Sequence, residues 1–386
     1  MPRFRNALCQ AGVVPNRLKR GEVSISGGIP YIMLESSMIG IAAFGAGKWG
    51  KNLIRDFAAQ KNAELRYVCD LDDKVLARLA IAYPKTRMIK EKDTALNDPN
   101  VHGVVVAVDV PGHFALAKAA LLAGKHVFVE KPLTLTSRDS AELVELAQQR
   151  KRILMVGHLL KYHPAVRYIK QMITKGEIDP LYLYFQRVNL GVVRQQENAW
   201  WSLACHDISV ACYLLDAEPV SVSACGQSTL QPGVEDVVFA SLRFADNRMS
   251  HIHVSWLDPH KIRKVTVVGT KKMVVFDDME ASEKIRIYDK GAQLKQGVES
   301  YAEAITLRNG DIWIPRISTE EPLSLECAHF IDCIREDRQP LTDGLDGLSV
   351  VSVLEAGSRS LANGGSPASV RPTAQPQETR ELVTMR

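Results

Sequence analysis

No apolar run in the 386-residue sequence approaches the length that a membrane-spanning helix needs. The seven cysteines show no C-x-x-C pair and no paired framework, which is typical of reduced, mostly buried thiols in a cytoplasmic protein. The net charge is only +4 and the basic residues are dispersed, so the sequence indicates no nucleic-acid partner. At 46% hydrophobic and 24% charged residues, the composition is that of a soluble globular protein.

Signatures of hydrolases and of metal sites are missing too. No G-x-S-x-G motif and no Cys/His arrangement suggests a hydrolytic nucleophile. His251 and His253 alternate along one predicted strand, but no third ligand stands at metal spacing. We therefore expect these histidines on a sheet surface and expect no metal.

Residues 1–37 differ in character from the rest of the chain. Arginines and lysines are scattered among polar residues, and no apolar h-region of a secretory signal is present. The first predicted strand begins only at Met38. We expect a disordered extension, or a native chain that starts downstream near Met33 or Met38.

The stretch from Met38 to Asp70 organises the chain. A short apolar run, Ile39 to Phe44, predicts a strand buried on both faces, and Gly45, Gly47 and Gly50 then complete G-x-G-x-x-G. The first glycine permits a tight turn, the second lets a pyrophosphate approach the backbone, and the third lets the following helix pack closely. The loop precedes a predicted helix whose N-terminus favours a phosphate.

An acidic residue completes this fingerprint. Asp70 ends the next predicted strand, about 20 residues after Gly50, where a carboxylate accepts the ribose hydroxyls of NAD and repels the extra phosphate of NADP. Leu71 follows instead of an arginine. The sequence therefore predicts a dinucleotide site that takes NAD rather than NADP; a glycine-rich turn in another α/β fold is the alternative.

Helices and strands continue to alternate as far as Gly157, which predicts a parallel sheet with right-handed crossovers. After Gly157 the strands come close together and are joined by hairpin turns, which predicts a largely antiparallel sheet. We expect helices near 165–175 and 206–215 to cover one face of this sheet, and a second subunit to cover the other. The predicted strands of this half are 181–188, 220–226, 237–244, 249–256, 265–268 and 273–276, and the predicted closing helices are 323–335 and 347–361.

The predicted fold class is α/β, with a Rossmann parallel sheet followed by an α+β domain on an open, mostly antiparallel sheet. The predicted parts are an extension (1–37), an NAD-binding domain (38–157), a substrate and oligomerisation domain (158–345), a closing helix (346–363) and a polar tail (364–386).

Glu130-Lys131-Pro132 follows the fourth strand at its carboxyl end, the edge at which open α/β sheets bind ligands. A partly desolvated lysine beside a nicotinamide exchanges protons near neutral pH. A lysine at the start of a helix, paired with Glu130, is the alternative.

Several segments together resemble the glucose-fructose oxidoreductase and inositol dehydrogenase family, Gfo/Idh/MocA. They are VFVEKPLTLT, MVGHLLKYHPAV and LACHDISVACYLL, and the resemblance runs from about Met38 to Gly364. It implies the two-domain fold predicted above and the oxidation or reduction of sugar and cyclitol hydroxyls with a nicotinamide cofactor. The cofactor residues that it implies are Gly45, Gly47, Lys48, Trp49, Gly50, Asp70, Glu130 and Lys131.

The resemblance also implies two catalytic residues. Lys131 matches the lysine near the nicotinamide, which often precedes a cis proline, and His206 matches the histidine beside the reacting hydroxyl. Either can serve as the general base that takes the hydroxyl proton. Two departures stand out: Ser202 replaces an aspartate four residues before the histidine, and Val108-Asp109 replaces a Thr-Pro near the end of the third strand.

Within the family, the chain most resembles the bacterial branch that oxidises C3 of UDP-N-acetylglucosamine on the way to surface glycans and lipid A sugars. This resemblance implies Arg187 and Arg194 as partners of a diphosphate, and Tyr162, His163 and Asn189 as partners of sugar hydroxyls. A structural role is the alternative for each of these five residues. Because the second face of the predicted antiparallel sheet also needs a cover, we expect a homodimer or homotetramer built through the C-terminal sheet.

Other functions stay open at this point. Within the family they are a sugar ketoreductase, a cyclitol dehydrogenase and a redox-neutral glycosidase that uses NAD only transiently. Outside enzymology, a non-catalytic NAD-binding protein is the alternative, and the departures at Ser202 and Val108-Asp109 are its only support.

Overall fold

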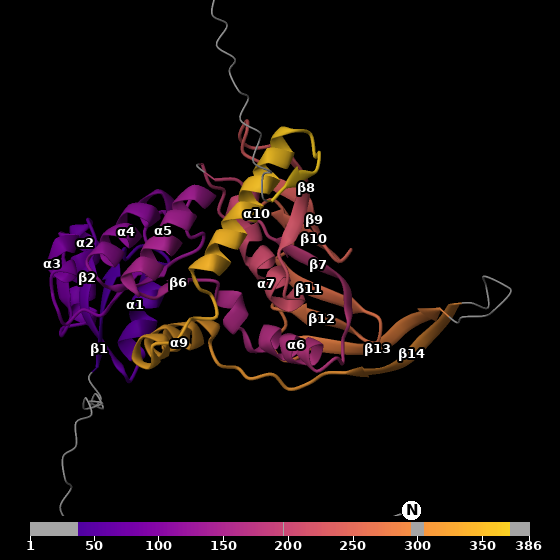
Figure 1. The fold of residues 1–386 in the computed structure, drawn as a ribbon, viewed down its shortest axis with the longest axis horizontal. Coiled ribbons are helices and arrows are strands. Elements are labelled where there is room, and N and C mark those ends of the chain that lie inside the picture. Colours follow the sequence, from indigo (N-terminus) through magenta and orange to yellow (C-terminus); the bar gives the residue numbers. More distant parts are fainter. Residues whose placement is uncertain (1–37, 196, 295–304, 371–386) are drawn as a thin grey trace, which may run out of the picture. The chain divides into compact units, whose positions relative to one another are not determined.

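The computed structural model describes residues 38–195, 197–294 and 305–370. The predictions made for residues 1–37 and 371–386 lie outside the described residues. Two sheets organise the described chain, and the elements around each are coloured by their place in the sequence in Figure 1.

The first sheet has six strands in the order β3-β2-β1-β4-β5-β6, and every pair in it is parallel. This confirms the predicted Rossmann sheet, although the short strand β3 was not predicted. Its strands are β1 (Ile39–Phe44), β2 (Ala63–Cys69), β3 (Arg87–Ile89), β4 (Gly103–Val106), β5 (His126–Val129) and β6 (Leu154–Val156). Its helices are α1 (Gly50–Ala59), α2 (Asp73–Ala82), α3 (Lys92–Leu96), η1 (Val110–Gly112), α4 (His113–Leu122) and α5 (Ser137–Arg150).

The second sheet has nine strands in the order β14-β13-β12-β11-β7-β10-β9-β8-β15. Only the central pair β7–β10 is parallel, so the prediction of a mostly antiparallel sheet is confirmed. Its strands are β7 (Pro180–Val188), β8 (Pro219–Gln227), β9 (Val237–Phe244), β10 (Met249–Ser255), β11 (Ile262–Gly269), β12 (Met273–Asp277), β13 (Ile285–Leu294), β14 (Ile305–Trp313) and β15 (Ala368–Ser369). The remaining helices are η2 (Leu159–Tyr162), α6 (Pro164–Thr174), η3 (Trp200–Ala204), α7 (Cys205–Leu215), α9 (Pro322–Glu336) and α10 (Gly344–Ala362).

Helices α6, α7 and α10 contribute buried side chains to one hydrophobic core with those of this sheet. Figure 1 shows the three helices beside the strands of the sheet. The burial pattern alternates along β9 and β10, so every second side chain points to the opposite face. That face, the open face, carries Tyr182, Tyr184, Phe239, His251 and His253, and none of these five is fully buried. His251 stacks on Tyr184 and His253 on Phe239.

The C-terminal segment corrects the sequence interpretation in two places. First, β15 lies within the range predicted as a polar tail, yet it pairs with β8, and Val370 after it is buried. Second, α9 lies within the range predicted for the substrate domain, but its side chains belong to the core of the parallel sheet. Phe330 of α9 packs edge-on against Phe57 of α1 and Phe128 of β5, with ring centroids 6.1 and 5.9 Å away.

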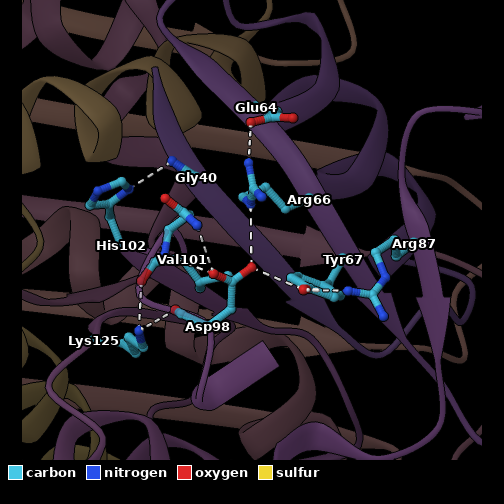
Figure 2. Close-up of polar contacts among 10 residues, drawn as sticks. Gly40, Glu64, Arg66, Tyr67, Arg87, Asp98, Val101, His102 and Lys125 are labelled. Atoms are coloured by element: carbon cyan, nitrogen blue, oxygen red, sulfur yellow. Dashed lines mark hydrogen bonds and ion pairs between the residues drawn. The ribbon is translucent and has the colours of Figure 1, made fainter. Parts of the chain in front are cut away.

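The amino edge of the parallel sheet is occupied by internal polar contacts (Figure 2). The ammonium of Lys125 donates to the carbonyls of Asp98 and Val101, at 2.8 Å each, and fixes the loop before β4. His102 accepts from the backbone of Gly40, and Asp98 accepts from the hydroxyl of Tyr67. These contacts pair several of the polar groups at this edge with one another, and the glycine-rich loop after β1 lies at the opposite, carboxyl edge.

Candidate active site

The glycine-rich loop after β1 has the geometry of a pyrophosphate cradle. Gly45 has a φ of 93°, and a Cβ there would lie 2.5 Å from the carbonyl oxygen of Ala107. A Cβ on Gly50 would lie 2.2 Å from the carbonyl oxygen of Gly45, so α1 packs closely against the turn. Gly47 instead faces open space, with no atom within 4 Å of an added Cβ. The loop is therefore tight at both ends and accessible in the middle.

The N-terminus of α1 is available to an anion. Trp49 at the N-cap makes no capping hydrogen bond with its side chain, and the first turn holds no acidic residue. The partial positive charge of the helix thus stays uncompensated there. Lys48 is exposed beside it.

Asp70 is fixed beside this loop. One carboxylate oxygen accepts from the backbone N–H of Ala46 at 2.7 Å, and the other accepts from the N–H of Asp72 at 2.9 Å. These bonds hold the carboxylate at the end of β2, where the fingerprint expects a ribose partner. The residues present therefore fit a dinucleotide.

Glu130 lies behind the loop and connects it to Lys131. Its carboxylate accepts from the indole N–H of Trp49 at 2.5 Å and from the backbone N–H of Lys131 at 3.2 Å. Burial raises the pKa of Glu130, and the ammonium of Lys131 opposes that shift. The Lys131–Pro132 peptide bond is cis.

Sequence reasoning missed His113. Its ring lies between the carbonyl oxygens of Pro132 and Val108, 2.9 and 3.0 Å from its two nitrogens. It thereby ties the loop after β4 to the Lys131–Pro132 turn. A histidine at the start of an apolar helix gives no local signal of this contact.

His206 lies in the first turn of α7, directly after the π-helical turn η3. Burial lowers the pKa of His206 well below its usual range, and the ammonium of Lys131 is the next largest cause. The imidazole is therefore neutral at physiological pH and able to accept a proton. Lys131 follows strand β5 of the parallel sheet and His206 lies on helix α7, and the charge of Lys131 acts on this imidazole.

The imidazole of His206 has no orienting carboxylate among the described residues. Its Nδ1 is buried and has no hydrogen-bond partner in that part of the chain. Ser202 occupies the position at which the resemblance places an aspartate, and it lies buried within η3. The departure noted in the sequence thus leaves one ring nitrogen unpaired.

Arg187 is already paired. Its guanidinium donates to both carboxylate oxygens of Asp207 at 2.7 to 3.1 Å, and both side chains are buried. Arg263 stands directly opposite Arg187 on the neighbouring strand β11. Its side chain is 43% exposed, and its nearest carboxylate, on Asp278, is 4.0 Å away. Arg263, which the sequence analysis did not single out, is thus the more available cation here.

The other predicted substrate residues have different surroundings. Tyr162 is fully buried in the core of the parallel sheet with its hydroxyl on Thr342, so its predicted contact with a sugar is wrong. His163 caps α6, with Nδ1 accepting from Ala165 and Nε2 3.4 Å from Asp278. Arg194 pairs with Glu197 at 2.7 Å, while Asn189 is half-buried at the end of β7.

A cavity of about 250 Å³ adjoins the Lys131–Pro132 turn. Its lining includes Val110, Pro132 and Leu135, which lie in the first half of the chain, and Asn198, Trp201 and Val234, which lie in the second. The cavity is therefore lined by segments from both halves of the chain and lies next to the residue that follows Lys131.

Other site types find no support in the described ranges. Within 38–195, 197–294 and 305–370, no three His, Cys, Asp or Glu side chains gather as metal ligands. In the same ranges, no helix has both the length and the apolar character needed to cross a bilayer.

Two family profiles match the chain. Residues 39–158 match the oxidoreductase family with an NAD-binding Rossmann fold, and residues 166–275 match the GFO/IDH/MocA C-terminal domain. The chain belongs to the Gfo/Idh/MocA oxidoreductase family. It is an oxidoreductase with an NAD-binding Rossmann domain, as the resemblance implied.

Curated relatives differ in their substrates. The chain is 26% identical over 300 residues to UDP-N-acetylglucosamine 3-dehydrogenase of Acidithiobacillus ferrooxidans, a match that covers 77% of this chain and 90% of the relative. It is 27% identical over 284 residues to scyllo-inositol 2-dehydrogenase (NAD(+)) of Bacillus subtilis, covering 70% of this chain and 78% of the relative.

Solved structures support the same fold. The structure of GnnA, the UDP-N-acetylglucosamine 3-dehydrogenase from Acidithiobacillus ferrooxidans, matches with a TM-score of 0.73 at 24% identity, over 86% of this chain and 99% of that one. GenD2 from gentamicin A biosynthesis, solved in complex with NAD, matches with a TM-score of 0.72 at 24% identity, over 89% and 99% of the two chains.

Proposed function

We propose that the protein is an NAD-dependent dehydrogenase that oxidises the C3 hydroxyl of a UDP-linked N-acetylhexosamine to a 3-keto sugar. The observation that carries this proposal is the loop at the carboxyl edge of the parallel sheet, which is open at Gly47, holds Asp70 beside it and is followed at the same edge by Lys131, whose charge also acts on the buried imidazole of His206. This supports a site in which Lys131 supplies a cation and His206 a proton acceptor beside the cofactor loop. The 3-keto product would feed the synthesis of surface glycans or lipid A sugars.

The chain's own residues supply binding and proton transfer. The loop from Gly45 to Gly50 and the N-terminus of α1 would hold the pyrophosphate of NAD, and Asp70 would accept the hydroxyls of its ribose. When bound, NAD supplies the hydride acceptor. The carboxylate of Asp70 disfavours the additional phosphate of NADP, so NAD is the proposed cofactor.

Oxidation of an alcohol requires that its hydroxyl proton leave as the hydride departs. Neutral His206 accepts that proton, or Lys131 does so in its amine form; the other group then polarises the same oxygen. Burial lowers the pKa of His206, which leaves its ring unprotonated but also weakens it as a base, so this shift favours neither group. Loss of either group should lower kcat by about 10²- to 10⁴-fold, the usual range for general acid–base catalysis.

The positive charge of Arg263 favours a substrate that carries a diphosphate rather than an uncharged cyclitol. It faces Arg187 across the strand pair, and it contributes to the lowered pKa of His206, so it lies near the reacting centre. Two guanidiniums side by side repel each other, and a bound diphosphate would relieve that repulsion. Arg187 is held by Asp207, so we assign the diphosphate to Arg263, with Arg194 as a second partner.

The direct test supplies purified protein with NAD and UDP-N-acetylglucosamine and follows NADH by its near-ultraviolet absorbance. We expect NADH in the wild type and almost none in Lys131→Met or His206→Asn. A flat trace with a panel of nucleotide sugars, together with NADH from inositol, would make the cyclitol dehydrogenase the better assignment. Sugar release without net NADH would instead indicate the redox-neutral glycosidase.

We also infer that the chain forms a dimer or tetramer through the open face of its nine-stranded sheet. That face presents Phe239, which is 46% exposed, with the stacked rings around it. An apolar and aromatic sheet face of this kind is typical of a protein interface. We place the enzyme in the cytoplasm, because all six cysteines of the described residues are unpaired, as in a reducing compartment.

A further inference from the structure

Behind the reaction centre lies a buried histidine that the mechanism above does not use. His158 follows β6 and is 1% exposed, and neither of its ring nitrogens has a hydrogen-bond partner among the described residues. Buried polar atoms are nearly always paired, directly or through ordered water. Two orphaned nitrogens on one imidazole therefore call for an explanation.

The orphaned atoms face other orphaned atoms. Nε2 of His158 lies 3.8 Å from Oδ2 of Asp346, a carboxylate oxygen that is itself buried and unpartnered in the described structure. Nδ1 of His206 is the third group of this kind, and His158 contributes to the lowered pKa of His206. His158 and Asp346 thus form a buried pair of groups with unpaired atoms, and the charge of His158 acts on His206 of the reaction centre.

The second carboxylate oxygen of Asp346, Oδ1, has a partner. Its Oδ1 pairs with the ammonium of Lys161 in η2, which is buried and lies 5.5 Å from the ring centre of Tyr213 on α7. Asp346 itself lies in the first turn of α10, after the N-cap Asp343. The carboxylate is therefore held by a cation while one of its oxygens stays free toward His158.

The charges around His158 come from four elements. Lys131 follows β5, Lys161 belongs to η2, His206 begins α7, and Asp346 begins α10. Burial is the largest cause of the lowered pKa of His158, followed by Lys161 and then Lys131. A neutral imidazole can take a proton on one nitrogen and release one from the other.

We propose that His158 and Asp346 form a buried proton relay that accepts the substrate's hydroxyl proton from His206 or Lys131 and passes it toward solvent. The proposal rests on the dehydrogenase function proposed above. The base takes the proton as the C–H electron pair leaves with its hydrogen as hydride, and His158 receives that proton through a bridging water. It then releases the proton from its second nitrogen to the carboxylate of Asp346, whose side chain is 14% exposed.

This relay would supply the carboxylate that is missing at Ser202. Ser202 stands where the resemblance expects an aspartate, so the helix of His206 supplies no carboxylate to its imidazole. Asp346 supplies a carboxylate to the same cluster from α10 instead. His158 and Asp346 are thus positioning and relay residues that act through His206 and Lys131.

The test replaces His158 by Gln, which keeps a polar side chain but cannot exchange a proton, and Asp346 by Asn. We expect kcat to fall by about ten- to a hundredfold in each variant, with the KM for sugar and the Kd for NAD unchanged. Proton transfer should become rate-limiting, so the solvent deuterium isotope effect on kcat should rise, and small amine or imidazole buffers should partly restore the rate. His102→Gln, at the opposite edge of the parallel sheet, is the matched control and should behave as the wild type.

An unchanged kcat and solvent isotope effect in H158Q would overturn the relay. A lower kcat without any change in isotope effect, pH profile or buffer response would also overturn it, since this is the result of a structural role alone. If the wild type oxidises no nucleotide sugar, the proposed function fails. The relay is then tested by NMR of isotope-labelled protein, where D346N must shift the His158 ring resonances, and unshifted resonances would overturn it.

Discussion

Arg263 stands opposite Arg187 in the register of β7 and β11; within the described part of the chain, Arg187 lies 2.7 Å from the carboxylate of Asp207, whereas Arg263 lies 4.0 Å from that of Asp278. At the residue scale this asymmetry decides which cation is available to a substrate. Burial and the neighbouring Arg187 lower the pKa of Arg263, which shows how poorly its charge is compensated. A charge-assisted hydrogen bond to a diphosphate would supply that compensation.

Arg263→Gln should therefore weaken the binding of UDP, measured by calorimetry, by about ten- to a hundredfold, the equivalent of about 1.5–3 kcal/mol for a lost charged hydrogen bond. The KM for UDP-N-acetylglucosamine should rise by a similar factor, with kcat little changed. Lys264→Gln is the control, because Lys264 is adjacent in sequence but pairs with Asp277 at 3.1 Å. Equal UDP affinity in R263Q and wild type would contradict the assignment.

Glu326 should make the stability of the protein depend on pH. It is fully buried on α9, both of its carboxylate oxygens lack partners among the described residues, and burial, followed by Glu130, raises its pKa well above the usual range. The folded protein thus keeps a proton that the unfolded chain releases above about pH 4.5. Stability should fall by about 1.4 kcal/mol per pH unit above that value until the folded pKa is reached.

Glu326→Gln removes this proton release, so it should gain stability relative to the wild type as the pH rises. Urea unfolding at about pH 5.5 and about pH 7.5 measures the difference. Glu336→Gln, at the exposed end of α9, is the control. The hydrogen bond from Arg338 lowers the pKa of Glu336, so this substitution should change the pH dependence of stability only at lower pH. A difference between E326Q and wild type that is the same at both pH values would contradict the prediction.

At the element scale, different glycines of the loop after β1 are expected to serve different purposes: Gly45 the stability of the fold and Gly47 the binding of NAD. Gly45→Ala places a methyl group on a backbone with a φ of 93° and against the carbonyl of Ala107, and should cost about 1–3 kcal/mol of stability. Gly47→Ala meets no neighbour, so the fold should be unaffected while the methyl group obstructs the pyrophosphate. Thermal unfolding and NAD titration of both variants measure this contrast. A G47A variant with wild-type affinity for NAD would contradict the assigned cradle.

The same elements show what the sequence could predict. The fingerprint from Gly45 to Asp70 was predictable because its signals are local: an apolar run, three spaced glycines and an acid at the next strand end. Tyr162 was misassigned because its burial depends on Thr342, far along the chain. Strands β13 and β14 were missed because polar residues and glycine interrupt their apolar pattern.

Long-range contacts explain the remaining misses. Phe330 joins the parallel-sheet core from a helix that follows the second sheet in the sequence, so linear order assigned it to the wrong domain. Lys161 and Asp346 are separated by 185 positions and were not connected by any motif. Arg263 was not predicted as a site residue, because nothing in the sequence shows that it pairs with Arg187 of the neighbouring strand.

At the scale of the whole molecule, the open face of the nine-stranded sheet predicts self-association. Phe239→Glu places a charge in the middle of that face, where burying it against a second subunit would be costly. Light scattering after gel filtration should give an oligomeric wild type and a smaller species for F239E. Ile81→Glu, on the exposed side of α2, is the control and should leave the mass unchanged. A monomeric wild type would contradict the inferred interface.

The central claim is that one site, built by Lys131 and His206 between the two sheets, removes the hydrogen at C3 of a nucleotide sugar as hydride. The most direct test supplies NAD and UDP-N-acetylglucosamine deuterated at C3 and analyses the reduced cofactor by mass spectrometry. We expect the deuterium in NADH and a slower reaction than with the unlabelled sugar. NADH that carries no deuterium, or no NADH at all, would contradict the claim.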